Sequence, residues 1–309
     1  MHNKPKLNIK DQIEWFKNKG VTFKYFTELE AEIFLRESNY FFKLKAFAKN
    51  YDKDQNGKYI NLDFAYLREL SILDTSLRDI ILELCLTCEH LLKVHINNHC
   101  SESANNDGYV VVDKFLKDKN NKPKALKSFE KGNSNIYQKD LIEKYYIKQQ
   151  DGTYKNFFAL WNFIEILGFT EFVKFYIFYF EKQDENSQLA FSISKLRNAA
   201  AHNFCILHNL KNNRVLSFTS SKILQTKIRQ MSIFSPYHKL QQLNNPLFHD
   251  CVCLLYLTKQ ICPQKMKRKL NKKIVNFFRR SIKHSYYFKD NEIIKSSFSF
   301  IIKIFLRLF

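Results

Sequence analysis

The residues best suited to chemistry stand together in the run LRNAAAHN at residues 196–203, where an arginine precedes a histidine by five positions. Histidine has an unperturbed pKa near neutrality, so it can accept or donate a proton. Arginine keeps its charge and binds phosphate oxygens through paired N–H groups. His202 could draw the proton from a ribose 2′-hydroxyl while Arg197 stabilises the phosphorane, and RNA would be cleaved without a metal ion.

The spacing within this run limits what a single chain can do. On an ideal helix Arg197 and His202 lie roughly 140° apart, with about 7.5 Å of rise between them. Two copies of the chain across a twofold axis would supply two arginines and two histidines around one cleft. We therefore expect a composite site in a homodimer. The alternative interpretation is an exposed helix end, where His202 only interacts with the helix dipole.

The elements that must position this run are predicted to be helices. The chain has 6 glycines and 5 prolines among 309 residues, too few for the frequent turns of a β-sandwich or barrel. It also lacks a glycine-rich phosphate loop. The fold class is therefore predicted to be all-α. The ranges expected to be helical are 11–19, 27–38, 62–99, a pair bent at Gly168 within 157–181, and a helix through Leu189, Ile193, Leu196 and Ala200.

Two regions differ in amino-acid composition from the segments predicted to be helical. Residues 101–156 are rich in Asn, Gly and Lys, which predicts a polar, partly extended insertion. It is either a flap that contacts RNA or a solvated surface excursion. Residues 216–309 are predicted to form a basic helical extension of a helical domain at 1–215.

The charge of the chain indicates a polyanionic partner. Lysine and arginine number 50 against 30 acidic residues, a formal charge of +20, which is typical of nucleic-acid binding proteins. A merely soluble basic protein is the alternative. Aromatic residues interleave with the basic ones and could stack bases. The predicted RNA contacts are Lys43, Lys45, Lys265, Lys267, Arg268, Lys269, Lys272, Lys273, Arg279 and Arg280.

Other site classes are disfavoured by the sequence. Cys85 and Cys88 have zinc-knuckle spacing but lie in a helical run without a glycine turn, and the pair His95 and His99 lacks further ligands. We therefore predict no metal and no cofactor, and reduced cysteines. The most apolar stretch, 157–180, is interrupted by charges, and the N-terminus has no signal-peptide core. The chain is expected in the cytoplasm, away from the membrane.

Further blocks of residues follow one another in a recognisable order along 4–210. They are Lys4-Pro5, Gln12, Gly20, Leu35, Asn39-Tyr40, Asp74, Leu77-Arg78, Glu89, Trp161, Glu165, Gly168, Arg197-Asn198 and Ala201-His202-Asn203. In this arrangement the sequence resembles the abortive-infection family of the AbiD/AbiF type, whose members contain a HEPN helical domain. Lys43 and Ala46 depart from the family pattern, which has arginine and glycine there.

The resemblance implies an all-helical HEPN ribonuclease in phage defence, a toxin associated with a small noncoding RNA. It implies catalytic roles for Arg197 and His202, with Asn198 orienting the histidine or the phosphate and Asn203 in support. Glu89 would position Arg197 by ion pairing, or would be a structural contact between helices. Asp74 and Arg78, four residues apart, are expected to form an intrahelical ion pair.

Two other functions stay open on the sequence. The first is an RNA-binding scaffold that holds a noncoding RNA and in which the arginine and histidine are inert. The second is an antitoxin that partners a nucleotidyltransferase, although such partners are usually shorter and less basic.

Overall fold

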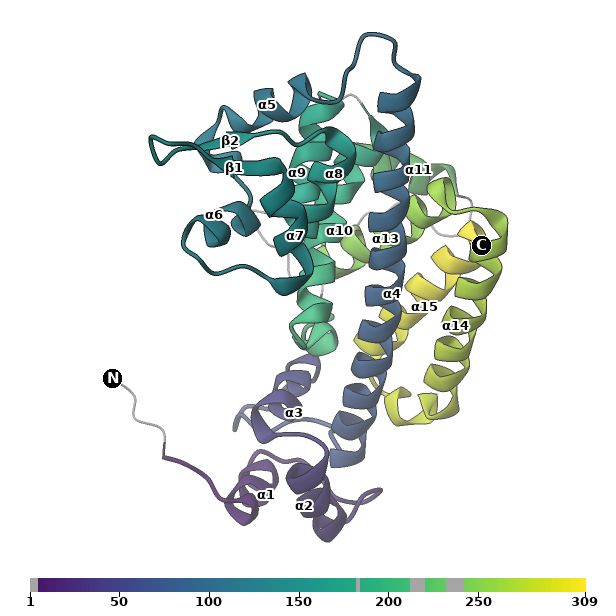
Figure 1. The fold of residues 1–309 in the computed structure, drawn as a ribbon. Helices are drawn as coiled ribbons and strands as arrows, with labels where there is room; N and C mark the ends of the chain where they lie inside the picture. The colour runs from purple at the N-terminus through teal and green to yellow at the C-terminus, as the bar shows by residue number, and fades with distance from the viewer. Residues whose placement is uncertain (1–4, 182–183, 212–219, 232–241) are drawn as a thin grey trace. The chain divides into compact units, whose positions relative to one another are not determined.

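The computed structural model describes residues 5–181, 184–211, 220–231 and 242–309 (Figure 1). Helices dominate these residues and a single two-stranded sheet accompanies them, so the predicted all-α fold is confirmed. The helices are α1 Ile9–Asn18, α2 Glu28–Glu37, α3 Phe41–Phe47, α4 Phe64–Glu102, α5 Val110–Leu116, α6 Lys124–Glu130, α7 Ile136–Tyr145, α8 Leu160–Ile166, α9 Phe169–Tyr179, α10 Glu185–Ala201, α11 Lys222–Gln230, α13 Pro246–Ile261, α14 Gln264–Lys283 and α15 Glu292–Leu308.

The chain divides into two compact units that interleave along the sequence. The first unit comprises Met1–Glu83, Leu196–Leu255 and Gln264–Phe309, and the second comprises Leu84–Lys195 and Tyr256–Pro263. The predicted boundary between residues 215 and 216 lies outside the described residues. The helices α14 and α15 share the first unit with α1, α2 and α3.

Local sequence signals explain the first two helices. Asn8 caps α1, and Gly20 follows its end with a φ of +79°, a left-handed conformation that glycine adopts at no steric cost. The predicted capping box of α2 is confirmed, since the Thr27 N–H donates to Glu30 Oε2 at 2.8 Å and the Glu30 N–H donates to Thr27 Oγ1 at 3.3 Å.

The long helix α4 begins at a carboxylate that also binds an earlier segment. Asp63 Oδ1 accepts the Ala65 N–H at 2.9 Å, and Oδ2 accepts the Lys24 N–H at 2.7 Å. Asp63 therefore fixes the start of α4 against residues 22–24. Within the first unit, the apolar stripe of α4 is buried at the spacing that a helix requires, at Leu67, Leu70, Leu73 and Ile81.

The region 101–156 of the second unit is more helical than the sequence predicts. It contains α5, α6 and α7, and its extended part is limited to the hairpin of β1 (Tyr146–Lys148) and β2 (Tyr154–Asn156). The apolar run 110–112 begins α5. Gly108 precedes it with a φ of +76°, and a Cβ there would come within 2.7 Å of the Trp161 ring. The predicted helix pair bent at Gly168 is confirmed as α8 and α9.

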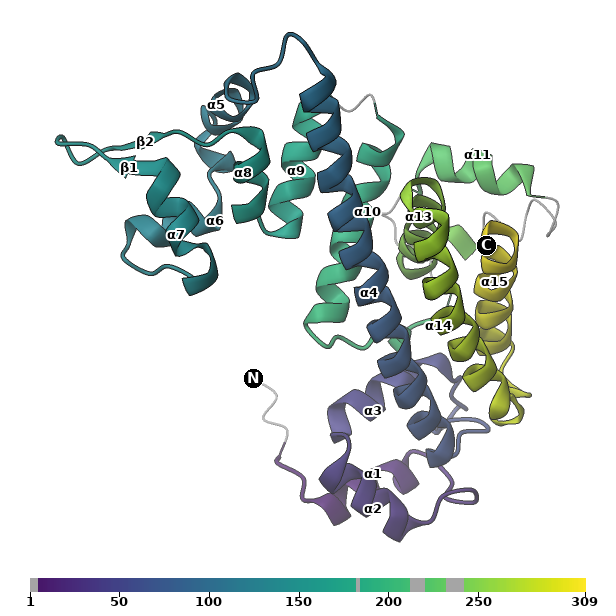
Figure 2. The same ribbon diagram turned by 45° about the vertical axis from the view of Figure 1, so that its right-hand side comes forward.

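Two C-terminal helices of the first unit pack through aromatic side chains. Figures 1 and 2 both place α14 and α15 side by side. Phe278 meets Phe305 at 5.3 Å between ring centroids, and Phe277 meets Phe298 at 6.4 Å. The buried residues of α14 form one stripe, Leu270, Ile274, Phe277, Phe278 and Ser281, which leaves the opposite face to its lysines and arginines.

Candidate functional site

The run LRNAAAHN forms the end of α10 and the turn that follows it. Ala201 is the last helical residue, so His202 lies one position beyond the helix rather than within it. The His202 N–H still donates to the Asn198 carbonyl at 3.0 Å, which keeps the histidine on the helical path. The Asn203 N–H donates to the Ala200 carbonyl at 3.2 Å and the Phe204 N–H to the Ala199 carbonyl at 3.0 Å. These two bonds are those of a Schellman motif.

The motif places the polar side chains at different depths. His202 is exposed and Arg197 is half-buried. One guanidinium nitrogen of Arg197, Nη1, donates to Asn198 Oδ1 at 3.3 Å. The Arg197 Nε is buried and has no hydrogen-bond partner among the described residues. An unsatisfied buried N–H costs about 1–3 kcal/mol, and more when the group is charged. Phosphate oxygens are acceptors that guanidinium N–H groups bind in pairs.

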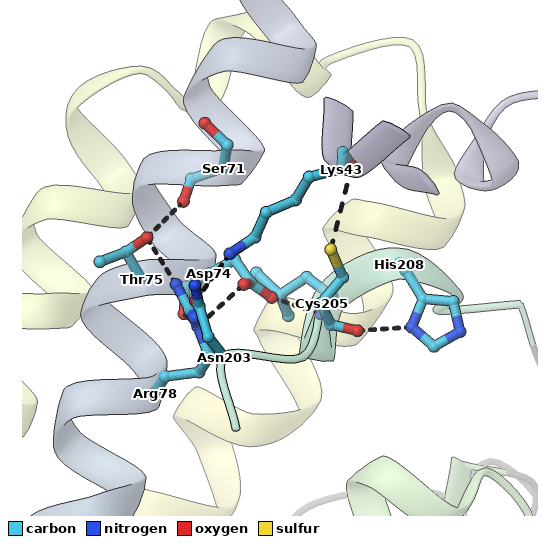
Figure 3. Close-up of polar contacts among 9 residues, drawn as sticks. Lys43, Ser71, Asp74, Thr75, Arg78, Asn203, Cys205 and His208 are labelled. Carbon is cyan, nitrogen blue, oxygen red and sulfur yellow. Dashed lines mark hydrogen bonds and ion pairs between the residues drawn. The ribbon is translucent and has the colours of Figure 1, made fainter. Parts of the chain in front are cut away.

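Asn203 is the left-handed residue of the motif, and a side chain from a distant helix holds it in place. Its φ is +58°, a left-handed value that asparagine tolerates better than most residues. Its Oδ1 accepts a hydrogen bond from Lys43 Nζ of α3 at 2.8 Å (Figure 3). Lys43 is only 5% exposed. We call this contact between α3 and the turn after α10 the Lys43–Asn203 brace.

A buried carboxylate of α4 anchors the segment that follows the turn. Asp74 Oδ1 accepts the Leu207 N–H at 2.8 Å, and Oδ2 pairs with Arg78 Nε at 3.1 Å (Figure 3). The predicted ion pair between Asp74 and Arg78 is thereby confirmed. Burial raises the pKa of Asp74, and the Leu207 N–H and Arg78 oppose this rise. Burial, with the neighbouring Arg78 guanidinium, lowers the pKa of Lys43.

The side-chain amide of Asn50 also binds backbone groups of the segment after the turn. Its Nδ2 donates to the Leu207 carbonyl at 2.8 Å, and its Oδ1 accepts the Leu210 N–H at 2.7 Å. The His208 ring nitrogen Nδ1 lies 2.6 Å from the Cys205 carbonyl oxygen. The side chains of Lys43, Asn50 and Asp74 therefore hold residues 203–210 in place. The exposed His202 lies directly before this fixed segment.

The predicted positioning residue Glu89 belongs to the second unit. Its carboxylate lies 4.0 Å from Lys93 Nζ, one turn along α4. Its pairing with Arg197 stays a prediction.

The predicted RNA contacts have different surroundings. Lys43 is buried in the brace, which argues against direct contact with RNA. Lys45 lies over the Trp15 ring at 4.4 Å, Lys273 pairs with Glu83 at 2.6 Å, and Arg280 pairs with Glu69 at 2.7 Å. The others lie on α14, where Lys267 is half-buried and the exposed ones are Lys265, Arg268, Lys269, Lys272 and Arg279.

Sequence reasoning missed two contributors to this site. It treated Asp74 only as a partner for Arg78, although its second oxygen holds Leu207, 133 residues away. It also passed over Phe204, an exposed aromatic residue beside His202. Asn203, directly after the helix, could have indicated the Schellman motif, since asparagine sometimes replaces glycine at such helix ends.

The described residues contain no group of three or more His, Cys, Asp and Glu side chains that could hold a metal ion. In the same residues, we find no helix with the length and apolar character needed to span a bilayer.

Comparison with known protein families gives a match to this chain. The family model described as Abi-like protein matches residues 33–208, which include α3, α4, the brace and the whole LRNAAAHN run. No curated protein and no solved structure matches this chain. Because the family model covers more than half of the chain, and the covered part contains the candidate site, this protein belongs to the Abi-like protein family.

Proposed function

We propose that this Abi-like protein is a metal-independent endoribonuclease, the toxin of an abortive-infection system of the AbiD/AbiF type with a HEPN core. The observation that carries the proposal is the end of α10, where an exposed histidine follows an arginine with an unsatisfied N–H on a backbone fixed by buried contacts. His202 takes the proton of the 2′-hydroxyl, whose oxygen attacks the neighbouring phosphorus while the P–O5′ bond breaks. The leaving 5′-oxygen receives a proton from an imidazolium, so that one fragment ends in a 2′,3′-cyclic phosphate and the other in a 5′-hydroxyl. Arg197 binds the phosphorane oxygens, and Asn198 keeps the guanidinium in place.

The basic face of α14 supports RNA as the substrate class. The charged residues of this face are all positive, because the twenty residues of α14 include no Asp or Glu. Such a face binds a phosphate backbone with an affinity that falls as salt rises. A small noncoding RNA is the partner proposed to occupy this face, and the composite site in a homodimer is proposed to cut the substrate.

Alanine substitution of the two proposed catalytic residues tests the enzyme. Either Arg197→Ala or His202→Ala should lower the rate of RNA cleavage on the order of 10²-fold or more, and the double variant should lose toxicity in cells. RNA affinity, measured by filter binding, should change little because the basic face remains. Chelator-treated wild-type protein should cleave as before.

His90→Ala is the matched control, since His90 is an exposed histidine on a different helix, α4. It should cleave RNA and kill cells like the wild type. Toxicity that survives the double alanine change, or cleavage that stops with chelator, contradicts the proposal.

An RNA-binding scaffold is the second candidate, favoured by the exposed basic face of α14 itself. It predicts tight RNA binding with no cleavage by the wild type. In that case the copurified RNA should be a single intact species, and its length should not change when Arg197 or His202 is replaced.

A further inference from the structure

The apolar side chain of Phe204 is exposed to solvent and lies next to the proposed catalytic histidine. It is 61% exposed. Its ring centroid lies 6.0 Å from that of His202, and the two planes are tilted by 35°. Single exposed aromatic residues are common on proteins, so the argument rests on where this ring stands and on what holds it there.

The backbone fixes Phe204 on both sides. Its N–H is bonded to the Ala199 carbonyl, and the residue before it is held by the Lys43–Asn203 brace. On its other side, residue 207 is bonded to Asp74 of α4. The ring is therefore presented by a rigid turn rather than by a loose loop.

The sequence of α10 explains why the ring does not fold back onto the helix. In a Schellman motif, the residue at the position of Phe204 usually packs against a residue in the last turn of the helix. That residue is Ala199, whose single methyl group gives a phenyl ring little surface to cover. The alanines at 199–201 thus leave the ring exposed.

This inference rests on the proposed ribonuclease function: we propose that Phe204 is a stacking subsite that takes an unpaired nucleobase of the RNA next to the bond to be cut. Aromatic side chains stack on any base because every base has a π-face. A base on this ring must leave its own helix, so the subsite accepts single-stranded RNA and rejects a duplex. The ribose of the stacked nucleotide then lies beside the His202 imidazole.

A fluorescence experiment tests the subsite without needing cleavage. The variant Phe204→Trp is made in an Arg197→Ala background, which keeps His202, and is titrated with a single-stranded oligoribonucleotide of mixed sequence. The protein has two other tryptophans, Trp15 and Trp161, so the Arg197→Ala protein alone gives the reference signal. Stacking should quench the additional fluorescence of F204W, and the same sequence as a duplex should quench it far less.

Leu29→Trp is the matched control, since Leu29 is an apolar residue of the same unit and is 68% exposed. Its fluorescence should not change on RNA binding. Equal quenching of L29W and F204W, or none in either under saturating RNA, overturns the subsite.

Substitutions in the otherwise wild-type protein separate stacking from simple apolar contact. Phe204→Ala should raise the Kd for single-stranded RNA about 5- to 150-fold, and Phe204→Tyr should restore it. Phe204→Leu, apolar but not aromatic, should behave like alanine. A change of oligomeric state in place of a change in Kd would identify the ring as a protein interface and overturn the proposal.

The two proposals fail in different ways. If wild-type protein cleaves no RNA but F204W is quenched, the ribonuclease proposal fails and RNA stacking at this ring stands. If cleavage is normal and neither F204W fluorescence nor the KM of F204A changes, the ribonuclease stands and the subsite does not.

Discussion

At the scale of single residues, the most informative group is the ammonium of Lys43. It is buried next to Asp74 and Arg78, and it donates a hydrogen bond to Asn203 Oδ1. The sequence predicted the ion pair between Asp74 and Arg78 because the four-residue spacing is local. It could not predict the Lys43–Asn203 brace, since nothing local marks a partner 160 residues away.

The lowered pKa of Lys43 predicts a pH-dependent stability. Between that lowered value and the ordinary 10.5, the unfolded chain still holds a proton that the folded chain has lost. The free energy of unfolding therefore gains a contribution as pH rises through this window. Lys43→Met removes the group. In urea unfolding at increasing pH, the wild type should gain stability relative to K43M as 10.5 is approached.

Lys49→Met, which removes an exposed lysine six residues later, serves as the control for the loss of a positive charge. If the stability of the wild type and of K43M follows parallel curves over this window, the buried ammonium does not titrate as argued.

At the scale of elements, α14 divides its cations between two tasks. Arg280 makes a paired contact with Glu69 of α4, at 2.7 Å and 2.9 Å, and Glu69 is 1% exposed. Arg279, its neighbour, is exposed. The sequence predicted a basic helical segment here. It could not show which arginine meets a carboxylate 211 residues earlier in the chain.

Adjacent arginines of α14 should therefore respond in opposite ways. Arg280→Ala leaves the Glu69 charge buried without this partner and should lower the free energy of unfolding by about 3 kcal/mol. Arg279→Ala should change it by no more than about 0.5 kcal/mol but should weaken RNA binding. Urea unfolding and filter binding measure the two effects. Equal effects of both variants in both assays would contradict this division.

At the scale of the whole molecule, helix content was predictable and the grouping of helices was not. Apolar periodicity and the scarcity of glycine and proline are properties of short windows, and they gave the all-α class. The first compact unit joins segments from the start, middle and end of the chain, and the second joins two segments that are 60 residues apart in sequence. Such grouping depends on non-local packing, which leaves no signal in any one window. The same limit made residues 101–156 look more extended than they are.

The proposed composite site requires two copies of the chain. If the cleft needs an arginine from one copy and a histidine from the other, inactive Arg197→Ala and inactive His202→Ala proteins should regain activity when they are mixed and allowed to exchange subunits. The mixed dimer still has one of each residue across the axis. RNA cleavage by the mixture measures this, with sedimentation to confirm the dimer. An active monomer, or a mixture that stays inactive, contradicts the composite site.

The brace between Lys43 and Asn203 also bears on when the proposed site can form during translation. A ribosome releases the chain from its N-terminus, so Lys43 waits for 160 further residues before its acceptor exists. Asp74 likewise waits for Leu207. During most of its synthesis the nascent polypeptide has neither His202 nor the contacts that fix the turn around it, so the proposed site can assemble only late in translation.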